Sequence, residues 1–406
     1  MVERLSSTPR RCGFKSRQLH HGLVMWYNAL MKIGVNARLL TKPFTGIGQY
    51  TRNLVAELAR KDAETQYVLL VPHEIPHQLV TEFPENVEIK VLKEKKFPSA
   101  GLRKTWWEQI QVPEFFVKQK VDVAFFTYPS NPWTNDWYKK GPKTAVTVHD
   151  CIPWMNKNYR KGILSKMYHS QTRRAVKKAD LVLTVSGSSK EDIEKVCEVA
   201  EKKIEVVYND VSPVYKEEPH RTFVNEVLGR YSLKSGKYFL YVGGYDERKN
   251  VNHLVQEFLK FEKDNRGIPL VLAGGKLFKN KLYKSFDKLE NLGNIVKTGF
   301  LSEEELACLY RNSLAFVNLS KHEGFNLTIL EAANSGTAMI LSDIPVHREV
   351  AENSALFTKN NEVIKSLEEM MNEKKRSEWQ KKSAALAKKY SWKKYAQIVK
   401  DMLHSL

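Results

Sequence analysis

The chain has 406 residues, of which 42% are hydrophobic and 11% aromatic, so it is long enough for two globular domains and is not intrinsically disordered. No stretch approaches the roughly 20 apolar residues of a membrane-spanning helix, which predicts a soluble or surface-bound protein. The net charge of +19 favours anionic partners, and four scattered cysteines predict a reducing compartment and no cysteine-bound metal.

Residues 1–30 differ from the rest of the chain. They are rich in arginine, contain one acidic residue and show no clear periodicity. We expect a disordered basic extension or a start site placed too early, with a transit peptide as the alternative.

Strands and helices are predicted to alternate from Met31 onward, beginning with a strand at Lys32–Asn36 and a helix at Gln49–Arg60. Further strands are predicted, with helical stretches between most of them, at Tyr67–Val71, Val87–Val91, Val121–Phe126, Thr144–His149, Leu181–Val185 and Ile204–Val207. We assign residues 31–212 to a first domain and residues 213–237, where the pattern loosens, to a linker.

The alternation restarts in residues 238–388, which we assign to a second domain. Strands are expected at Tyr238–Val242, Leu270–Ala273, Ile295–Thr298, Leu314–Leu319 and Ala338–Leu341. Helices are expected at Val251–Lys263, Lys279–Asn291, Glu303–Arg311, Leu327–Ser335, Glu362–Asn372 and Glu378–Tyr390. Residues 389–406 predict a last helix that docks through Trp392, Tyr395, Ile398 and Met402.

This alternation predicts the α/β class, with two parallel sheets covered by helices. Two such domains joined by a linker imply a cleft between them. Ligands of open α/β sheets bind beyond the carboxyl ends of the strands, so polar residues that follow strands are the candidate site residues.

Two candidate positions lie in the first domain. Gly46 and Gly48 precede the helix at Gln49, where glycines let backbone N–H groups approach a phosphate closely. His149, with Asp150, ends the fifth strand and could bond a substrate hydroxyl. An ordinary loop and a structural histidine explain these residues equally well.

Two further positions lie in the second domain. Gly243 and Gly244 follow a strand and precede Arg248 and Lys249, a pair suited to a diphosphate, although these cations could simply pair with neighbouring acids. The segment HEGFNLTILE carries Glu323 and Glu331 on either side of a helix start at Phe325–Thr328, which is a natural anion site. Its alternative is a strand, turn and helix with two solvated glutamates.

Basic segments indicate a partner surface. Lys157–Lys178 contains eight cations and no acid, with Ile163, Leu164, Met167 and Ala175 as its apolar members, so we expect an amphipathic helix. Lys93–Lys104 is also basic and precedes two tryptophans, of which Trp107 could equally pack internally. A solvated basic face explains Lys157–Lys178 equally well. As a partner, an anionic membrane surface fits both segments better than nucleic acid, for which no motif is present.

The chain from Met31 onward resembles retaining, nucleotide-sugar-dependent glycosyltransferases of family 4, which have two Rossmann-like domains facing a central cleft (the GT-B architecture). The motifs that carry the resemblance are TGIGQYTRNL, WEQIQVP, TVHDCIP, LTVSGSSKEDI, VVYND, YVGGYDERKNV, LVLAGG, HEGFNLTILEAANSGTAMILSDIPVHREV and the terminal YSW helix. Within the family it is most similar to the mannosyltransferase-like branch that builds cell-surface polysaccharides.

The resemblance implies a role for each candidate. His149 and Glu323 would contact the transferred sugar, Glu331 the ribose, and Arg248 and Lys249 the diphosphate, without a metal or other cofactor. The remaining donor-binding positions would be Gly46, Gly48, Gly243, Gly244, Gly324, Phe325, Asn326 and Leu327. The last helix would cross back to the N-terminal domain.

The resemblance also implies a hexose transfer from a nucleotide-diphosphate sugar, with GDP-mannose favoured, to a glycan or lipid-linked acceptor in the cytoplasm or on the inner face of the plasma membrane. Asn326 and Thr328 replace a commoner Gly and Pro, which leaves glucose, N-acetylglucosamine and rhamnose as possible sugars besides mannose. Because fold does not determine function, a non-catalytic nucleotide-sugar-binding protein and a phosphorylase or epimerase of the same fold also fit the sequence.

Overall fold

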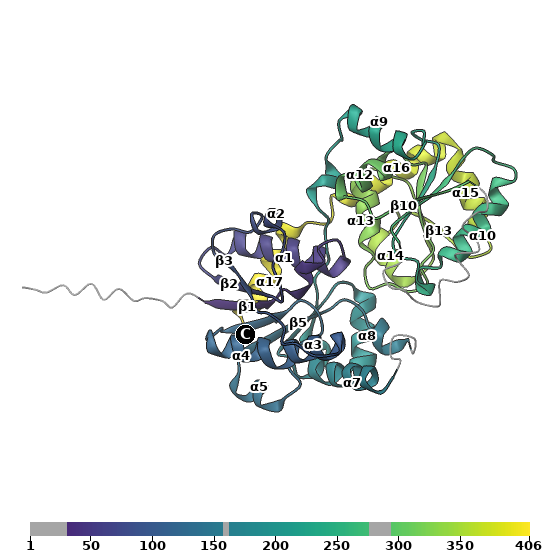
Figure 1. Cartoon of the computed structure of the whole chain (residues 1–406). Helices are drawn as coiled ribbons and strands as arrows, with labels where there is room; N and C mark the ends of the chain where they lie inside the picture. The colour runs from purple at the N-terminus through teal and green to yellow at the C-terminus, as the bar shows by residue number, and fades with distance from the viewer. Residues whose placement is uncertain (1–30, 157–161, 276–293) are drawn as a thin grey trace, which may run out of the picture. The chain divides into compact units, whose positions relative to one another are not determined.

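The computed structural model describes residues 31–156, 162–275 and 294–406, which form two parallel sheets covered by helices (Figure 1). The predicted α/β class is confirmed. The predictions for residues 1–30, for Lys157 to Lys161 of the basic segment and for the helix at Lys279–Asn291 lie outside the described residues. Within these ranges, no helix has both the length and the apolar composition needed to cross a bilayer.

The first sheet has seven strands in the order β3-β2-β1-β4-β5-β6-β7, and every pair of neighbours is parallel. Its central strands are buried along almost their whole length because helices cover both faces. The strands are β1 (Lys32–Asn36), β2 (Gln66–Val71), β3 (Val87–Val91), β4 (Val123–Phe126), β5 (Lys143–Val148), β6 (Leu181–Thr184) and β7 (Ile204–Val206).

The first long helix begins earlier than the sequence predicted. Helix α1 starts at Gly46 rather than at Gln49, because the Thr45 side chain accepts a hydrogen bond from Gly48 N at 3.2 Å and caps the helix. Gly46 and Gly48 therefore lie in the first turn of α1 and not in a preceding loop. The helical elements of this half are η1 (Arg38–Thr41), α1 (Gly46–Lys61), α2 (His77–Val80), α3 (Ala100–Trp106), η2 (Trp107–Gln111), α4 (Val112–Lys118), α5 (Asn135–Lys140), α6 (Ile152–Met155), α7 (Ile163–Lys178), α8 (Gly187–Cys197) and η4 (Glu201–Lys203).

The second sheet has six strands in the order β10-β9-β8-β11-β12-β13, again all parallel. The strands are β8 (Phe239–Val242), β9 (Leu270–Ala273), β10 (Ile295–Gly299), β11 (Ala315–Asn318), β12 (Met339–Ser342) and β13 (Leu356–Thr358), the last of which the sequence analysis missed. The helical elements are η6 (Glu247–Lys249), α10 (Val251–Glu262), α12 (Glu303–Arg311), α13 (Leu327–Asn334), α14 (Pro345–Ala351), α15 (Val363–Met371) and α16 (Glu373–Ala387).

The segment expected to be an irregular linker contains two helical elements, η5 (Pro213–Lys216) and α9 (Arg221–Arg230). Helix α9 forms because Val227 and Leu228 are buried on one of its faces. The boundaries proposed above for the domains and the linker stay a prediction.

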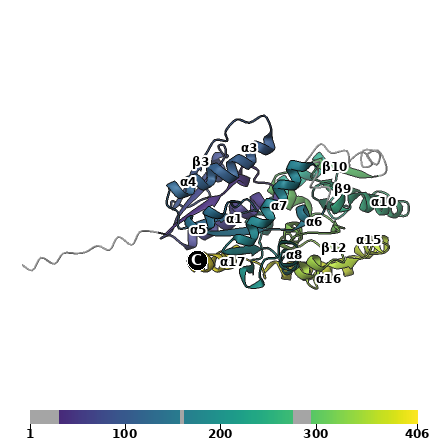
Figure 2. The same ribbon diagram turned by 90° about the horizontal axis from the view of Figure 1, so that it is seen from below.

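The last helix, α17 (Trp392–His404), packs against α1 of the first half, and the two lie side by side in both views (Figure 1 and Figure 2). Trp392 and Tyr395 are buried as expected. The rest of the buried face consists of Ala396, Val399 and Leu403, whereas Ile398 and Met402 are only half-buried. The docking face is therefore shifted by one residue from the predicted stripe.

In each sheet the chain first adds strands toward one edge and then continues toward the other edge. This switch lies between β1 and β4 in the first sheet and between β8 and β11 in the second. The loops that leave such neighbouring strands diverge to opposite faces of the sheet and open a crevice where ligands bind. Arg248 and Lys249 follow β8, and Glu323 follows β11, so these candidates flank the crevice of the second sheet.

Candidate functional site

Glu323 is the carboxylate on which the two predicted cations converge. Its side chain is 7% exposed, and it accepts hydrogen bonds from Arg248 Nη1 and from Lys249 Nζ, the latter at 2.6 Å. Arg248 Nη1 also donates to the carbonyl of His322 at 2.9 Å. The loops after β8 and β11 are thus joined by an ion-pair cluster that the sequence analysis did not predict. The alternative of pairing with a neighbouring acid holds in part, since Arg248 Nε also lies 3.4 Å from Asp246 Oδ1.

The charge state of Glu323 follows from this cluster. Burial would raise the pKa of Glu323, but the charges of Lys249 and Arg248 outweigh it and lower the pKa to about 2. The carboxylate is therefore ionised at neutral pH. An anionic ligand that took over either cation would leave Glu323 free to accept hydrogen bonds from hydroxyl groups.

Gly324 brings the two halves of the chain into contact. A Cβ atom on Gly324 would lie 2.1 Å from the carbonyl oxygen of His149, so only glycine fits between these loops. On the other side, the Ser186 hydroxyl donates to the Gly324 carbonyl at 2.6 Å. His149 and Glu323 are therefore held in neighbouring loops.

His149 follows β5 and is neutral. Burial lowers its pKa to about 4, against the opposing hydrogen bond with the carbonyl of Thr127 at 2.9 Å. Because that carbonyl can only accept, the Nε2 atom of His149 carries the proton. The ring packs edge-on against Tyr50 at 4.6 Å between centroids. This leaves Nδ1 as the ring atom able to bond a ligand.

The first turns of two helices lie next to each other at this point. A Cβ atom on Gly46, at the start of α1, would be 3.8 Å from Leu327 Cδ1, at the start of α13. Gly48 allows close backbone packing, since a Cβ there would lie 2.2 Å from the carbonyl oxygen of Lys42. Helix starts offer unpaired N–H groups and a positive dipole end, so this place suits an anion.

Gly243 and Gly244 shape the turn that leads from β8 to the cations. Gly243 has a φ of 147°, and its carbonyl oxygen lies against Gly274, where a Cβ atom would be only 2.3 Å away. The Tyr241 hydroxyl donates to the Gly244 carbonyl at 2.6 Å. These contacts give the two glycines a role in shaping the loop that carries Arg248 and Lys249.

Phe325 and Asn326 complete the loop before α13. The Phe325 ring is buried and packs near Tyr208 and Tyr390, so only its backbone can face a ligand. Asn326 is the N-terminal flanking residue of α13 and is 7% exposed. Its side chain is hydrogen-bonded to His347 and Thr328.

Glu331 lies on α13, four per cent exposed, and accepts a hydrogen bond from the Tyr310 hydroxyl at 2.9 Å. Burial raises its pKa to about 7, and the bond from Tyr310 only partly opposes this shift. Glu331 thus differs from Glu323: one buried carboxylate has cationic partners, and the other has a neutral hydroxyl.

The raised pKa predicts that Glu331→Gln stabilises the protein at pH 8. In the unfolded chain the carboxyl has a pKa near 4.5 and in the folded chain near 7, so wild-type stability falls as pH rises between these values and stays low above 7. A neutral amide avoids this loss. We expect the free energy of unfolding to rise by about 1–3 kcal/mol at pH 8 and to change little at pH 5. Denaturant unfolding at both pH values measures this, and an equal change at both would contradict it.

Two contacts near the site were missed by sequence reasoning. Gly187 N and Ser188 N, at the start of α8, donate to the two carboxylate oxygens of Glu349 on α14 at 2.6 and 3.0 Å. This binds a carboxylate of the C-terminal half to a helix N-terminus of the N-terminal half. The signal available was the Ser186 capping position in the VSGSS motif, but its partner is more than 160 residues away.

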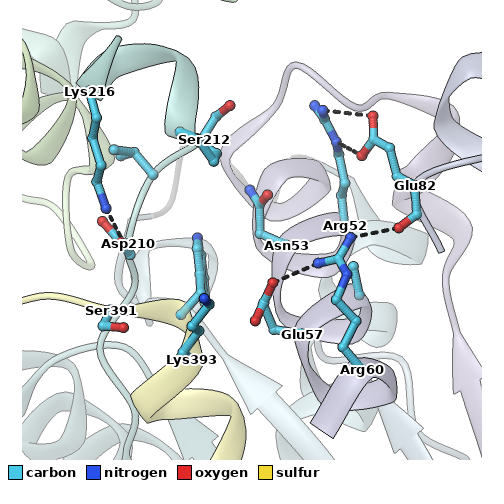
Figure 3. Close-up of a pocket in the computed structure, with 14 residues that line it drawn as sticks. Arg52, Asn53, Glu57, Arg60, Glu82, Asp210, Ser212, Lys216, Ser391 and Lys393 are labelled. Carbon is cyan, nitrogen blue, oxygen red and sulfur yellow. Dashed lines mark hydrogen bonds and ion pairs between the residues drawn. The ribbon is translucent and has the colours of Figure 1, made fainter. Parts of the chain in front are cut away.

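A cavity of about 510 Å³ lies elsewhere, between α1, the segment Asp210–Lys216 and the start of α17 (Figure 3). Arg52 is paired with Glu82 in this cavity, and Lys216 with Asp210. Arg52 Nη1 also lies 3.5 Å from Glu303 of α12. None of the candidate site residues lines this cavity. Apart from Glu82, its lining comes from α1 and from the two segments that connect the halves of the chain.

No group of three or more His, Cys, Asp or Glu side chains suited to hold a metal ion occurs in the part of the chain that the structure describes. The cluster around Glu323 contains cations as well as acids, which suits an anion better than a free metal ion.

Known protein families match both halves of the chain. Residues 44–213 match the model of glycosyltransferase family 4, and residues 230–402 match that of glycosyl transferases group 1. Together the two models span most of the chain, including every candidate site residue.

Two curated relatives are O-antigen chain mannosyltransferases. The protein from Salmonella typhimurium is 29% identical over 233 residues, which are 56% of this chain and 61% of that protein. The protein from Escherichia coli is 25% identical over 256 residues, or 62% of this chain and 67% of that protein. The chain thus spans about two thirds or less of the relatives that it matches.

Solved structures match almost the whole chain at low identity. HepE from Anabaena, in complex with UDP and glucose, has a TM-score of 0.69 at 13% identity, covering 93% of this chain and all of that chain. WaaG, a glycosyltransferase involved in lipopolysaccharide biosynthesis, has a TM-score of 0.70 at 12% identity, covering 92% of this chain and 99% of that chain. At these identities the likeness shows the fold, which is that of GT-B glycosyltransferases.

Proposed function

This chain belongs to glycosyltransferase family 4, and from that premise we propose that it transfers a hexose, with retention of configuration, from a nucleotide-diphosphate sugar to a glycan or lipid-linked acceptor. The observation that carries the proposal is the cluster of Arg248, Lys249 and Glu323 beside the start of α13. It combines two cations for a diphosphate with an ionised carboxylate for sugar hydroxyls.

The proposal assigns each part of the donor to residues of this cluster and its surroundings. The diphosphate lies between Arg248, Lys249 and the backbone N–H groups at the starts of α1 and α13, with Gly46 and Gly48 allowing its approach. The sugar contacts Glu323 and Nδ1 of His149. Glu331 binds the ribose hydroxyls, and the backbone of Gly324 and Phe325 encloses the donor.

The chemistry then needs no group beyond those of the chain and its substrates. As the bond from the anomeric carbon to the diphosphate breaks, the leaving group gains charge, which the two cations and the helix starts stabilise. Glu323 and His149 hold the sugar while it develops positive charge. The acceptor hydroxyl attacks from the face of the departing phosphate, which takes up its proton. The catalytic residues are therefore His149, Glu323, Arg248 and Lys249.

The favoured donor is GDP-mannose and the favoured pathway is cell-surface polysaccharide synthesis. The support comes from the two O-antigen chain mannosyltransferases, which are relatives at 25–29% identity. A donor carrying glucose, N-acetylglucosamine or rhamnose is the alternative, as HepE was solved with UDP and glucose. A non-catalytic nucleotide-sugar-binding protein is a second alternative, but Arg248, Lys249, Glu323 and Glu331 are all present.

A panel of nucleotide sugars tests the proposal. The protein is incubated with GDP-mannose, UDP-glucose, UDP-N-acetylglucosamine and dTDP-rhamnose, with and without a lipid extract, and the released nucleotide is measured. We expect release from GDP-mannose that increases with the extract and persists in EDTA. Release without acceptor dependence would favour a hydrolase, and no release from any donor would favour the non-catalytic alternative.

Two adjacent helices of the N-terminal half favour an anionic membrane as a further partner, on the cytoplasmic side. Of the predicted apolar face of α7 only Ala175 is buried, whereas Ile163, Leu164 and Met167 are 78%, 68% and 57% exposed. Helix α3 adjoins α7, since Lys104 Nζ donates to the Tyr168 hydroxyl at 2.9 Å. Trp107 is fully buried, so it packs internally and only its neighbour Trp106 is exposed.

We expect the protein to float with vesicles that contain anionic lipid and not with neutral ones, and to be released by salt. The double variant Leu164→Ser/Met167→Ser should lose most of this binding, because it removes apolar surface that a bilayer would bury. The matched control is Val117→Ser, which changes an exposed apolar residue on another helix. Equal flotation of wild type and double variant would rule out α7 as the membrane contact.

A further inference from the structure

The end of β12 and the helix α14 that follows it hold the loop before α13 at two points. The Ser342 hydroxyl donates to the carbonyl of Ser320, at the start of the loop, at 2.5 Å. At the end of the loop, Asn326 Nδ2 lies 2.9 Å from His347 Nε2. Glu323, Gly324 and Phe325 lie between these two anchors.

The hydrogen bonds of His347 have one consistent direction. Its Nδ1 atom lies 3.1 Å from the carbonyl oxygen of Ser342, which can only accept, so Nδ1 carries the proton and donates. In a neutral ring Nε2 then accepts from the Asn326 amide. Burial lowers the pKa of His347 to about 4, so the ring is neutral at pH 7.

Both polar atoms of the Asn326 side chain are held by such contacts. Its Oδ1 atom accepts from the Thr328 hydroxyl at 2.7 Å, while Nδ2 donates to His347. One N–H of the amide and one lone pair of Oδ1 remain for any ligand. The backbone is equally constrained: φ is 72° and ψ is 72°, a left-handed conformation that asparagine adopts more readily than other residues with a side chain.

We propose that Asn326 and His347 are a positioning pair that fixes the left-handed turn before α13 and thereby places Glu323 and the start of α13 against the donor. Asn326 then supports the site from behind and does not read the sugar, in contrast to the role we expected from the sequence. The effect of this pair on donor binding rests on the proposed function, whereas the pairing of Asn326 with His347 is a property of the fold.

Variants at position 326 separate positioning from recognition. Asn326→Gly keeps the left-handed turn without strain, so we expect kcat/KM to fall only a few-fold. Asn326→Ala loses the same two side-chain hydrogen bonds as Asn326→Gly but must also adopt the left-handed turn with a Cβ atom, so we expect a loss of tenfold or more. Within each variant, the factor by which kcat/KM falls should be the same for GDP-mannose as for the next-best nucleotide sugar. A change of more than tenfold in the ratio of the two donors would overturn the proposal.

A stability cycle tests the pair without any activity. His347→Leu should lower Tm in the wild-type background and lower it much less in Asn326→Gly, because its partner is already gone. His347→Gln, which can both accept and donate, should recover part of the loss. The matched control is Ser232→Ala, a change at another left-handed position (φ 55°) outside the site, which should not couple to His347. Additive losses in the cycle would refute the pairing even if no donor is turned over, whereas a failed donor panel alone would refute only the proposed function.

Discussion

Lys249→Ala is expected to lower kcat by about 10²–10³-fold while the protein keeps its fold. Lys249 Nζ lies 2.6 Å from Glu323 Oε1. In the function proposed above, it is one of two cations that stabilise the charge developing on a departing diphosphate. Removal of one such group from a preorganised site typically costs this much. Nucleotide release from GDP-mannose at saturating donor measures the effect, and circular dichroism checks the fold.

The same variant has a consequence for stability that does not depend on catalysis. The pKa of Glu323 is depressed to about 2 in the folded protein, so its pairing contributes stability above the unfolded pKa of 4.5, and this contribution is lost as pH falls through 2. Without Lys249 the pKa of Glu323 rises. The free energy of unfolding should fall by roughly 1–3 kcal/mol at pH 7, and the difference from wild type should shrink as the solution is acidified.

Lys389→Ala is the matched control, because Lys389 forms an exposed ion pair with Glu352 in the same half of the chain. Exposed pairs contribute little, so this variant should keep both activity and stability. Full activity of Lys249→Ala would refute the proposed role of Arg248 and Lys249 in stabilising the leaving group. Equal losses in both variants would point to a general effect of removing charge.

The parts of the fold that could be predicted depend on short stretches of chain. Strand β9 (LVLA) is an apolar run, and β3 (VEIKV) alternates apolar and charged residues; the limits of both were predicted to the residue. Because the ends of parallel strands meet at one edge of a sheet, the order of the motifs also placed Arg248 and Glu323 near each other. Their direct pairing is in the structure, and their contacts with a donor stay a prediction.

The parts that could not be predicted depend on residues far apart in the sequence. Glu349 binds the start of α8 from 162 residues away, and nothing local distinguishes it from any other glutamate on a helix. The same holds for His347, whose partner Asn326 stood out only as a departure from a family pattern. The exposure of Ile163 and Leu164 could not be decided from the sequence for another reason: the spacing of apolar residues shows a face but not whether a neighbouring helix covers it.

Gly324→Ala is expected to reduce kcat/KM by about 10²-fold or more, through geometry alone. The added Cβ atom would lie 2.1 Å from the carbonyl oxygen of His149 and 3.1 Å from Asp150 Cβ, so the loops after β5 and β11 must move apart. His149 is a candidate site residue, and Asp150 follows it in the same loop. A displacement of about 1 Å between reacting groups can cost 10²-fold in rate. Product nucleotide binding, measured by calorimetry with GDP, should weaken less, because Arg248 and Lys249 lie on the same half as Gly324.

The control for Gly324→Ala is Gly229→Ala. Gly229 lies in helix α9, and a Cβ atom there would meet nothing within 4 Å. This change should leave activity unaltered and raise stability slightly, by the preference of helices for alanine. The two variants add the same methyl group, so a difference between them measures the contact between the halves. Full activity of Gly324→Ala would mean that His149 and Glu323 do not act on one sugar in this arrangement. The catalytic role of His149 would then be withdrawn before that of Glu323, because Glu323 keeps its cationic partners within its own half.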